Sequence, residues 1–321
     1  MKKKRIKSLI FGISGQDGSY LSHFLINRKH DICGITRNSN KNNLKNLTRL
    51  GILKKVKIIK CDIANFLAVK KLIKKIRPDE IYYLCGQSSV TESYIDPEEA
   101  FKSNTLSLLN VLEVVKKTNK KIKIFNAVSG QFYGDRKKSI YNEKSYISPQ
   151  SPYGTSKAAS YWLVKIFRES YGIKCCNGIL FNHESPLRSE KFVTKKIINH
   201  CHLIKKRKIK YLYMGDINIS RDWGWAPEYV EAMYLMLRQK DPKDLVIGSG
   251  KKHSLKSFIY EAFRLLRIPR NRLKANTKKF IRNKDIKSYL SDPRLAKKIL
   301  KWKAKTSFKQ IVKKMIYDEL F

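Results

Sequence analysis

Acidic residues, cysteines and long hydrophobic runs are all scarce in this chain of 321 residues. The apolar stretch behind the basic amino terminus is only a few residues long, so we expect neither a signal peptide nor a membrane span. The cysteines show neither metal-ligand spacing nor the density of a secreted disulfide scaffold. We therefore expect free thiols in a reducing cytoplasm, no metal site and no membrane partner. The six cysteines are Cys33, Cys61, Cys85, Cys175, Cys176 and Cys201.

The shortage of acidic residues leaves a very basic chain. Only 26 Asp and Glu stand against 69 Lys and Arg, which gives a formal net charge of +43. Such a charge favours contact with polyanions such as nucleic acid. However, the basic residues are 52 lysines and 17 arginines spread over nearly every expected helix, whereas phosphate-binding surfaces favour arginine and interleaved aromatics. We expect non-specific polyanion binding at low salt and no specific nucleic-acid partner.

A glycine-rich turn follows the first expected strand. Residues 6–11 have the pattern of a short buried strand, and the following Gly-x-x-Gly-x-x-Gly segment leads into a helix. In this order the first glycine makes a tight turn, the second lets backbone amides approach a pyrophosphate, and the third permits close packing. The amino end of the helix adds a positive dipole. The pattern predicts dinucleotide binding by Gly12, Gly15, Gln16, Asp17 and Gly18.

A tyrosine and a lysine lie four residues apart in the segment Ser151-Pro-Tyr-Gly-Thr-Ser-Lys157. On a helix these positions are neighbours, so Lys157 would hold positive charge near Tyr153. That charge lowers the pKa of a phenol, which can then take the proton of a sugar hydroxyl. Together with the glycine-rich turn, this pair is the form found in short-chain dehydrogenases. The sequence therefore predicts hydride transfer from an alcohol.

Strand-like and helix-like segments alternate through the first half of the chain. The expected strands are 6–11, 31–35, 56–60, 80–84, 123–127, 177–181 and 245–249. Such alternation predicts an α/β fold with a Rossmann-type, doubly wound parallel sheet. We expect a cofactor domain at 1–180 and a smaller, mostly C-terminal substrate-binding region at 181–321, with segments near 222–250 returning to the first. A helix is expected to open at Asp222 and to run to about Gln239, and the cleft between the two parts is the expected site.

Several motifs together resemble the GDP-mannose 4,6-dehydratases, a family of extended short-chain dehydrogenases/reductases, over essentially the whole chain. The segments that carry the resemblance are 12–21, 151–157, 168–172, 177–186, 192–197 and 221–224. Segment 177–186, Asn-Gly-Ile-Leu-Phe-Asn-His-Glu-Ser-Pro, is a highly specific match. The resemblance implies a GDP-sugar substrate, a homodimer or homotetramer, and a role in nucleotide-sugar metabolism and polysaccharide biosynthesis.

The resemblance also implies NADP as the cofactor. Arg37 follows the second expected strand, where an arginine pairs with a 2′-phosphate and an acidic residue would favour NAD. Asn38 replaces a second arginine that is usual in the family, so NAD stays open as an alternative. Asp62 resembles the adenine-contacting aspartate, with helix capping as its structural alternative. Gln87 belongs to a loop that in the family lies near the cofactor and the sugar.

The same resemblance points to six substrate-binding positions. Cations suit a diphosphate, and a carboxylate suits a diol. Generic surface charge is the alternative, which in so basic a chain applies most to Lys196 and Arg282 and least to Arg221. The six positions are Ser88, Asn182, Lys196, Arg221, Arg282 and Asp285.

The catalytic positions implied by the resemblance are Ser129, Gln131, Tyr153 and Lys157, of which Tyr153 and Lys157 also contact the cofactor. The family reaction oxidises C4, removes the C5 proton, expels the C6 hydroxyl as water and returns the hydride to C6. At position 131 the family has a glutamate, which takes the C5 proton. A neutral amide accepts no proton at working pH, and loss of a general base costs roughly 10²–10⁴-fold in rate.

Three hypotheses about function follow. The first is a GDP-mannose 4,6-dehydratase, slow or with another carboxylate such as Glu92 or Glu143 as the base. The second is a C4 dehydrogenase, 4-epimerase or reductase of a GDP-sugar, mannose or heptose, which stops before dehydration because of Gln131. The third is a non-catalytic partner or polyanion-binding protein, which the retained Ser129, Tyr153 and Lys157 oppose.

Overall fold

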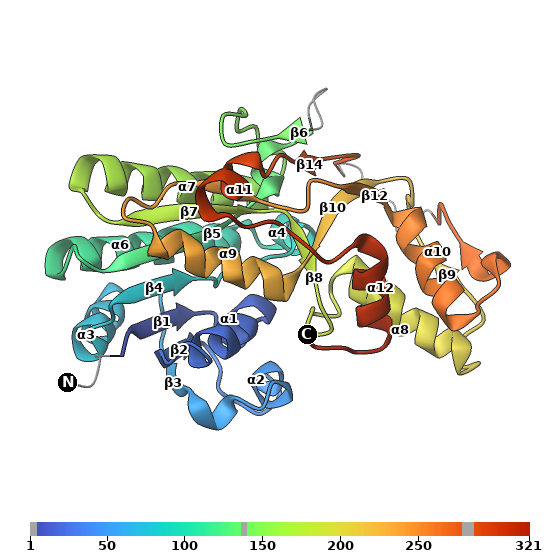
Figure 1. Cartoon of the computed structure of the whole chain (residues 1–321), viewed down its shortest axis with the longest axis horizontal. Coiled ribbons are helices and arrows are strands. Elements are labelled where there is room, and N and C mark those ends of the chain that lie inside the picture. Colours follow the sequence, from blue (N-terminus) through green and yellow to red (C-terminus); the bar gives the residue numbers. More distant parts are fainter. Residues whose placement is uncertain (1–4, 136–139, 278–285) are drawn as a thin grey trace.

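A seven-stranded sheet forms the middle layer of the larger part of the molecule (Figure 1). The computed structural model describes residues 5–135, 140–277 and 286–321. The strand order is β11-β7-β5-β4-β1-β2-β3, and every neighbouring pair is parallel. The strands are β1 (Lys7–Phe11), β2 (Asp31–Thr36), β3 (Lys57–Lys60), β4 (Glu80–Tyr83), β5 (Lys123–Ser129), β7 (Cys175–Leu180) and β11 (Leu245–Ile247).

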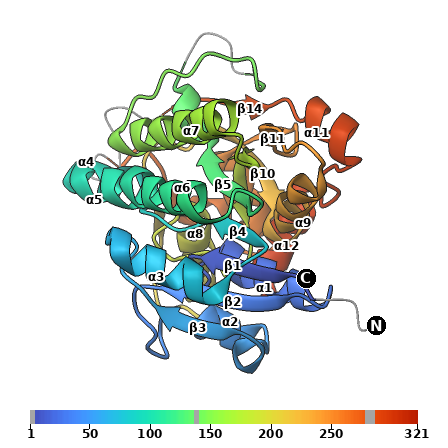
Figure 2. The same ribbon diagram turned by 90° about the vertical axis from the view of Figure 1, so that its left-hand side faces the viewer.

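Helices cover both faces of this sheet. Figure 2 shows α3, α6 and α7 on one side and α1 and α9 on the other. The predicted Rossmann-type, doubly wound α/β fold is therefore confirmed. The helices of this part are α1 (Gln16–Ile26), α2 (Lys45–Arg49), α3 (Phe66–Ile76), α4 (Val90–Ile95), α5 (Pro97–Phe101), α6 (Ser107–Thr118), α7 (Pro152–Tyr171) and α9 (Ala226–Arg238), with short turns η1 (Leu53–Lys55), η2 (Lys102–Leu106) and η3 (Gly130–Tyr133).

Helix α3 explains how so basic a chain builds an ordinary core. Its residues Val69, Leu72 and Ile73 are buried, while Lys71 and Lys74 on the other side are exposed. Apolar positions spaced three and four residues apart form one stripe on a helix, and this stripe packs on the sheet. The lysines thus lie on the solvent-exposed face of the helix, and the core remains apolar.

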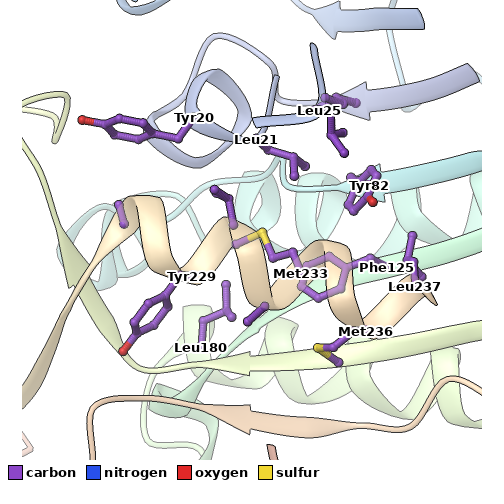
Figure 3. Close-up of a cluster of buried hydrophobic side chains, with 14 of the residues drawn as sticks. Tyr20, Leu21, Leu25, Tyr82, Phe125, Leu180, Tyr229, Met233, Met236 and Leu237 are labelled. Carbon is purple, nitrogen blue, oxygen red and sulfur yellow. The ribbon is translucent and has the colours of Figure 1, made fainter. Parts of the chain in front are cut away.

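Helix α9 returns late in the sequence to cover the face of the sheet that α1 also covers (Figure 3). Leu21 on α1 and Met233 on α9 belong to one buried cluster, together with Tyr82 on β4 and Phe125 on β5. The two helices are therefore held against the same sheet face although about 200 residues separate them in sequence.

Most of the remaining elements form a second region with its own buried core, which contains Ile197, Trp223, Phe258 and Met315. Its main helices are α8 (Val193–Lys205), α10 (Leu255–Leu266) and α12 (Phe308–Ile316), and its three-stranded sheet has the order β12-β10-β8. Its strands and smaller elements are β8 (Asn182–Glu184), β10 (Ser220–Trp225), β12 (Lys252–Ser254), β9 (Leu212–Tyr213), β13 (Leu273–Lys274) and η4 (Arg270–Arg272). Helix α11 (Arg294–Leu300) packs instead on the main sheet beside β11 and α9, and β6 (Ile140–Tyr141) pairs with β14 (Leu290–Ser291). The domain division at residue 180 stays a prediction.

The prediction that a helix opens at Asp222 is wrong at its start. Residues 220–225 form strand β10, which pairs with β8 and β12, and α9 begins only at Ala226 with Pro227 in its first turn. Asp222 does not cap that helix. Its carboxylate is buried and accepts hydrogen bonds from the backbone of Ser249 (2.9 Å) and Gly250 (3.0 Å). An aspartate before a proline-containing segment resembles a helix start, but here tertiary hydrogen bonds use the carboxylate.

The strand order reverses between β1 and β4, and this reversal fixes where a ligand can bind. In parallel α/β sheets the crevice lies at the carboxyl ends of the strands where the order reverses. Gly12 follows β1 and Cys85 follows β4, so the glycine-rich turn lies at this point.

Candidate active site

The glycine-rich turn has the shape that a dinucleotide requires. Gly12 has φ +85°, and a Cβ atom there would lie 2.9 Å from the Cα of Cys85. A Cβ at Gly18 would overlap the carbonyl of Gly12, so the third glycine allows α1 to pack on the turn. Gly15 is the residue before α1, and it has no side chain that could cap the helix. The first backbone amides of α1 are therefore left for an anionic ligand. These residues fit a pyrophosphate.

Gln16 and Asp17 direct their side chains toward strand β8. The Gln16 amide donates to the carbonyl of His183 (3.2 Å), and the Asp17 carboxylate lies 2.9 Å from His183 Nε2. Burial raises the pKa of Asp17, but the charge and hydrogen bond of His183 outweigh it and lower the pKa to about 2. Burial likewise lowers the pKa of His183, and Asp17 reverses this effect, so the pKa lies above its usual value. The turn is thus fastened to β8 by an ion pair.

The wall of the cleft that carries Tyr153 is built by β5, η3 and α7. Ser151 caps α7 by accepting from the amide of Gly154 (3.0 Å), and this places Tyr153 and Lys157 one turn apart. Lys157 Nζ donates to the carbonyl of Ala127 (2.9 Å) at the end of β5. Both side chains line the cleft, together with Ser129.

Burial dominates the electrostatics of this wall. It raises the pKa of Tyr153, while a hydrogen bond with Ser129 lowers it. It also lowers the pKa of Lys157 to about 8, so the ammonium is mostly charged at neutral pH. The hydroxyl of Ser129 is therefore the main group that favours the phenolate of Tyr153.

Gln131 lies on η3 and is held by a tyrosine that the sequence analysis did not single out. Its Nε2 donates to the phenol oxygen of Tyr289 (3.2 Å), and this phenol donates to Oδ1 of Asn182. The guanidinium of Arg221 lies over the ring of Tyr289, 5.1 Å from its centroid. No motif surrounds Tyr289, which lies 158 residues from Gln131, so nothing in the sequence indicates the contact.

The cleft has a volume of about 990 Å³ and lies between the two parts of the molecule. Elements from both regions line it, so the structure brings together nine of the predicted site residues. They are Asp17, Ser88, Ser129, Gln131, Tyr153, Lys157, Asn182, Lys196 and Arg221. Arg282 and Asp285 lie outside the described residues.

The remaining predicted cofactor residues lie away from the lining of the cleft. Asp62 is exposed, and its carboxylate accepts from the amide of Ala64 (3.0 Å), which is a local turn contact. Helix α3 starts later, with Asn65 as its capping residue. The backbone amide of Gln87 donates to the hydroxyl of Ser103 (2.9 Å), and this hydrogen bond fixes the loop after β4.

Arg37 extends into solvent from the end of β2. Its guanidinium donates to the carboxylate of Glu99 on α5 (2.6 Å), and 70% of its side chain is exposed. The residue is therefore accessible to a 2′-phosphate, but a carboxylate competes for it.

The two carboxylates considered as replacement bases do not line the cleft in the described part of the chain. Glu92 pairs with Lys191 (2.5 Å), and Glu143 accepts from the amide of Val246 (2.8 Å). Three other carboxylates do line it, but each has a partner. Asp17 pairs with His183, Glu184 accepts from Thr194 (2.6 Å), and Asp216 pairs with Lys287 (2.7 Å).

Known proteins decide the family. The sequence model of the GDP-mannose 4,6 dehydratase family matches residues 9–315. The chain belongs to this family. GDP-mannose 4,6 dehydratase 1 of Arabidopsis thaliana is 35% identical over 328 residues, with 99% of this chain and 91% of the relative covered. The Dictyostelium discoideum enzyme is also 35% identical, with 100% and 97% covered, and the Vibrio cholerae enzyme is 34% identical, with 98% and 93% covered. The resemblance inferred from the motifs is confirmed.

Solved structures share the fold of this chain. UDP-glucose 4-epimerase from Thermotoga maritima superposes with a TM-score of 0.86 at 21% identity, covering 98% of each chain. dTDP-glucose 4,6-dehydratase from Bacillus anthracis, in complex with NAD, gives 0.84 at 18% identity, covering 97% of this chain and 96% of that one. RMD from Pseudomonas aeruginosa, complexed with NADPH, gives 0.80 at 20% identity, covering 98% and 97%. Within the described residues, every helix is too short or too polar to cross a membrane.

Proposed function

We propose that this protein is a GDP-mannose 4,6-dehydratase, which converts GDP-mannose into its 4-keto-6-deoxy product. The observation that carries the proposal is the common cleft of Ser129, Tyr153 and Lys157 with Asn182 and Arg221, next to the glycine-rich turn. An alcohol bound there lies between a phenol that can take its proton and a surface suited to a dinucleotide. Family membership supports the choice of substrate.

Each residue of the cleft has its own role in the proposed reaction. Arg221 and Lys196 supply positive charge for the diphosphate, and Asn182 holds the sugar. The Ser129 hydroxyl and the Tyr153 phenol bind the oxygen at C4, and Tyr153 takes its proton during oxidation. Lys157, charged at neutral pH, favours the phenolate that results. When bound, a nicotinamide cofactor supplies a hydride acceptor for C4 and later a hydride donor for C6.

NADP is the cofactor that we propose, with NAD as the alternative. The exposed guanidinium of Arg37 supports a 2′-phosphate, because a charge-assisted hydrogen bond to a phosphate is among the stronger ones in proteins. Two residues weaken this preference for NADP. Asn38 carries no positive charge, and the carboxylate of Glu99 competes with a phosphate for the guanidinium of Arg37. Gly12, Gly15 and Gly18 serve the pyrophosphate in either case.

A homodimer or homotetramer is the proposed assembly. Trp162 and Ile166 lie one turn apart on α7 and are about half exposed, and Leu106 on the neighbouring η2 is 55% exposed. An apolar stripe of this kind on a solvated helix favours contact with a second copy of the chain. Sedimentation analysis tests this, because Trp162→Lys should then shift the protein toward the monomer.

A reducing cytoplasm and a role in polysaccharide biosynthesis complete the proposal. All six cysteines are free, which supports a reducing compartment. The lysines on solvated helix faces such as that of α3 account for part of the net charge, so we continue to expect no specific nucleic-acid partner.

A C4 dehydrogenase, epimerase or reductase of a GDP-sugar is the second candidate. Gln131 favours it, because its amide is bonded into a neutral chain with Tyr289 and Asn182. The test is to incubate the protein with GDP-mannose and NADP and to weigh the sugar product. Loss of one water supports the dehydratase. A sugar of unchanged mass, or one lighter by two hydrogens with reduced cofactor, supports the second candidate and contradicts the first.

A further inference from the structure

Dehydration without a glutamate at position 131 requires another group that carries protons. One proton must leave C5, and the oxygen leaving C6 must gain one. Gln131 performs neither transfer, because an amide is neutral over the working pH range. The carboxylates that line the described cleft are bonded to His183, Thr194 and Lys287, and none of them is hydrogen-bonded to Gln131.

Tyr289 is the ionisable side chain in hydrogen-bond contact with Gln131. Its phenol oxygen lies 3.2 Å from Gln131 Nε2 and donates to the side chain of Asn182, one of the residues assigned to the sugar. The residue is only 2% exposed, yet it lines the cleft that also holds Tyr153. A phenol therefore lies beside position 131, where the family has its base.

We propose that Tyr289 is the proton carrier of the dehydration step in this chain, an inference that rests on the proposed dehydratase function. After C4 is oxidised, the phenol gives its proton to the C6 oxygen, the C6–O bond breaks and water leaves. The C5 proton passes to the phenolate oxygen, and the electron pair of the C5–H bond forms the C5=C6 double bond, conjugated with the C4 carbonyl. The phenol is restored, so protons and charge balance within one turnover.

The environment of Tyr289 suits both halves of this step. Burial raises the pKa of the phenol to about 12, although Arg221 and the bond to Gln131 lower it. The group is therefore protonated at neutral pH and able to donate, and its phenolate is a stronger base than a carboxylate. The amide of Gln131 and the guanidinium of Arg221 stabilise the negative charge as it forms. A glutamate at position 131 would oppose that charge and would itself be the base, so Tyr289 carries the proton only beside the neutral amide of Gln131.

The test compares two readouts in four proteins: wild type, Tyr289→Phe, Gln131→Glu and the double variant. The readouts are transient cofactor reduction in a single turnover with GDP-mannose, which reports C4 oxidation, and water loss measured by mass. We expect Tyr289→Phe to keep C4 oxidation within about threefold and to lose roughly 10²–10⁴-fold in water loss. In the Gln131→Glu background, where a carboxylate is the base, the same change should cost less than tenfold. Tyr161→Phe is the matched control, since Tyr161 belongs to the same buried cluster but does not line the cleft.

A second measurement separates proton transfer from support of the fold. Replacing Tyr289 by 3-fluorotyrosine makes the phenol more acidic, and the pH profile of water loss should shift to lower pH without a change in the melting temperature. Unchanged water loss in Tyr289→Phe would overturn the role of Tyr289 and leave the dehydratase function standing. If Tyr289→Phe slowed C4 oxidation as much as it slowed the release of water, the role of Tyr289 would also be overturned. A wild-type protein that oxidises GDP-mannose without losing water would instead overturn the proposed function itself.

Discussion

The imidazole of His183 on β8 lies 2.9 Å from the carboxylate of Asp17, in the first turn of α1 behind the glycine-rich turn. This pair joins the part of the chain that is suited to the dinucleotide to the strand that carries Asn182. The side-chain amide of Gln16 donates both to the Asp17 carboxylate (3.0 Å) and to the carbonyl of His183 (3.2 Å), so a second contact ties the start of α1 to β8. A change at either residue should therefore affect cofactor and sugar binding together.

His183→Gln should remove a pH-dependent part of the stability. The pKa of His183 is raised above its ordinary value of 6.5, so the folded protein binds this proton more tightly than the unfolded chain. The pair's contribution is complete below about pH 6.5 and is lost as the pH rises through the raised pKa. The melting-temperature difference between wild type and variant should then be larger at pH 6 than at pH 9. His200→Gln is the control, because the His200 imidazole bonds the neutral backbone carbonyl of Lys196. A difference that does not change with pH would contradict this account.

Tyr153→Phe should abolish hydride transfer from the sugar. The phenol is the group that takes the proton of the C4 hydroxyl, and loss of such a base costs roughly 10²–10⁴-fold or more. Absorbance of the reduced cofactor in a single turnover measures this directly. Tyr161→Phe, one helix turn beyond Lys157 on the same helix, should retain the wild-type rate. Reduction at the normal rate in Tyr153→Phe would mean that another group is the base.

Gln131→Glu should raise the rate of water loss, by up to about 10²-fold, because a carboxylate can take the C5 proton. The rate of C4 oxidation should stay nearly constant, since Ser129 and Tyr153 are unchanged. Product mass against time measures the first rate, and cofactor absorbance measures the second. Gln150→Glu adds the same charge at an exposed position and should change neither rate. No gain in Gln131→Glu would show that position 131 does not limit dehydration.

Glu99→Gln should strengthen NADP binding relative to NAD. The change releases the Arg37 guanidinium from its 2.6 Å contact and removes a negative charge near the expected 2′-phosphate. We expect the ratio of the two dissociation constants to move about threefold to tenfold toward NADP, measured by titration of cofactor fluorescence. Arg37→Gln should move it the other way. Glu98→Gln, an exposed neighbour on α5, is the control and should leave the ratio unchanged.

Local patterns predicted the turn and the helix that form the site, because their geometry depends on nearby residues. Gly12 and Gly18 lie where close backbone approach requires them, and Tyr153 and Lys157 line one cleft because four residues make about one helical turn. Contacts between distant segments could not be predicted in this way. Tyr289 reaches Gln131 across 158 residues, and Glu99 reaches Arg37 across 62. A helix start at Asp222 was predicted wrongly because the partners of its carboxylate, Ser249 and Gly250, come from another part of the chain.

Transfer of a labelled hydride tests the central claim most directly. GDP-mannose that carries deuterium at C4 is incubated with the protein and unlabelled NADP, and the product is analysed by mass and by NMR. The account predicts a 4-keto-6-deoxy product that has lost one water and carries the deuterium at C6, because the hydride taken from C4 returns within the same cleft. Deuterium that stays at C4, or a product that keeps its C6 hydroxyl, would contradict it.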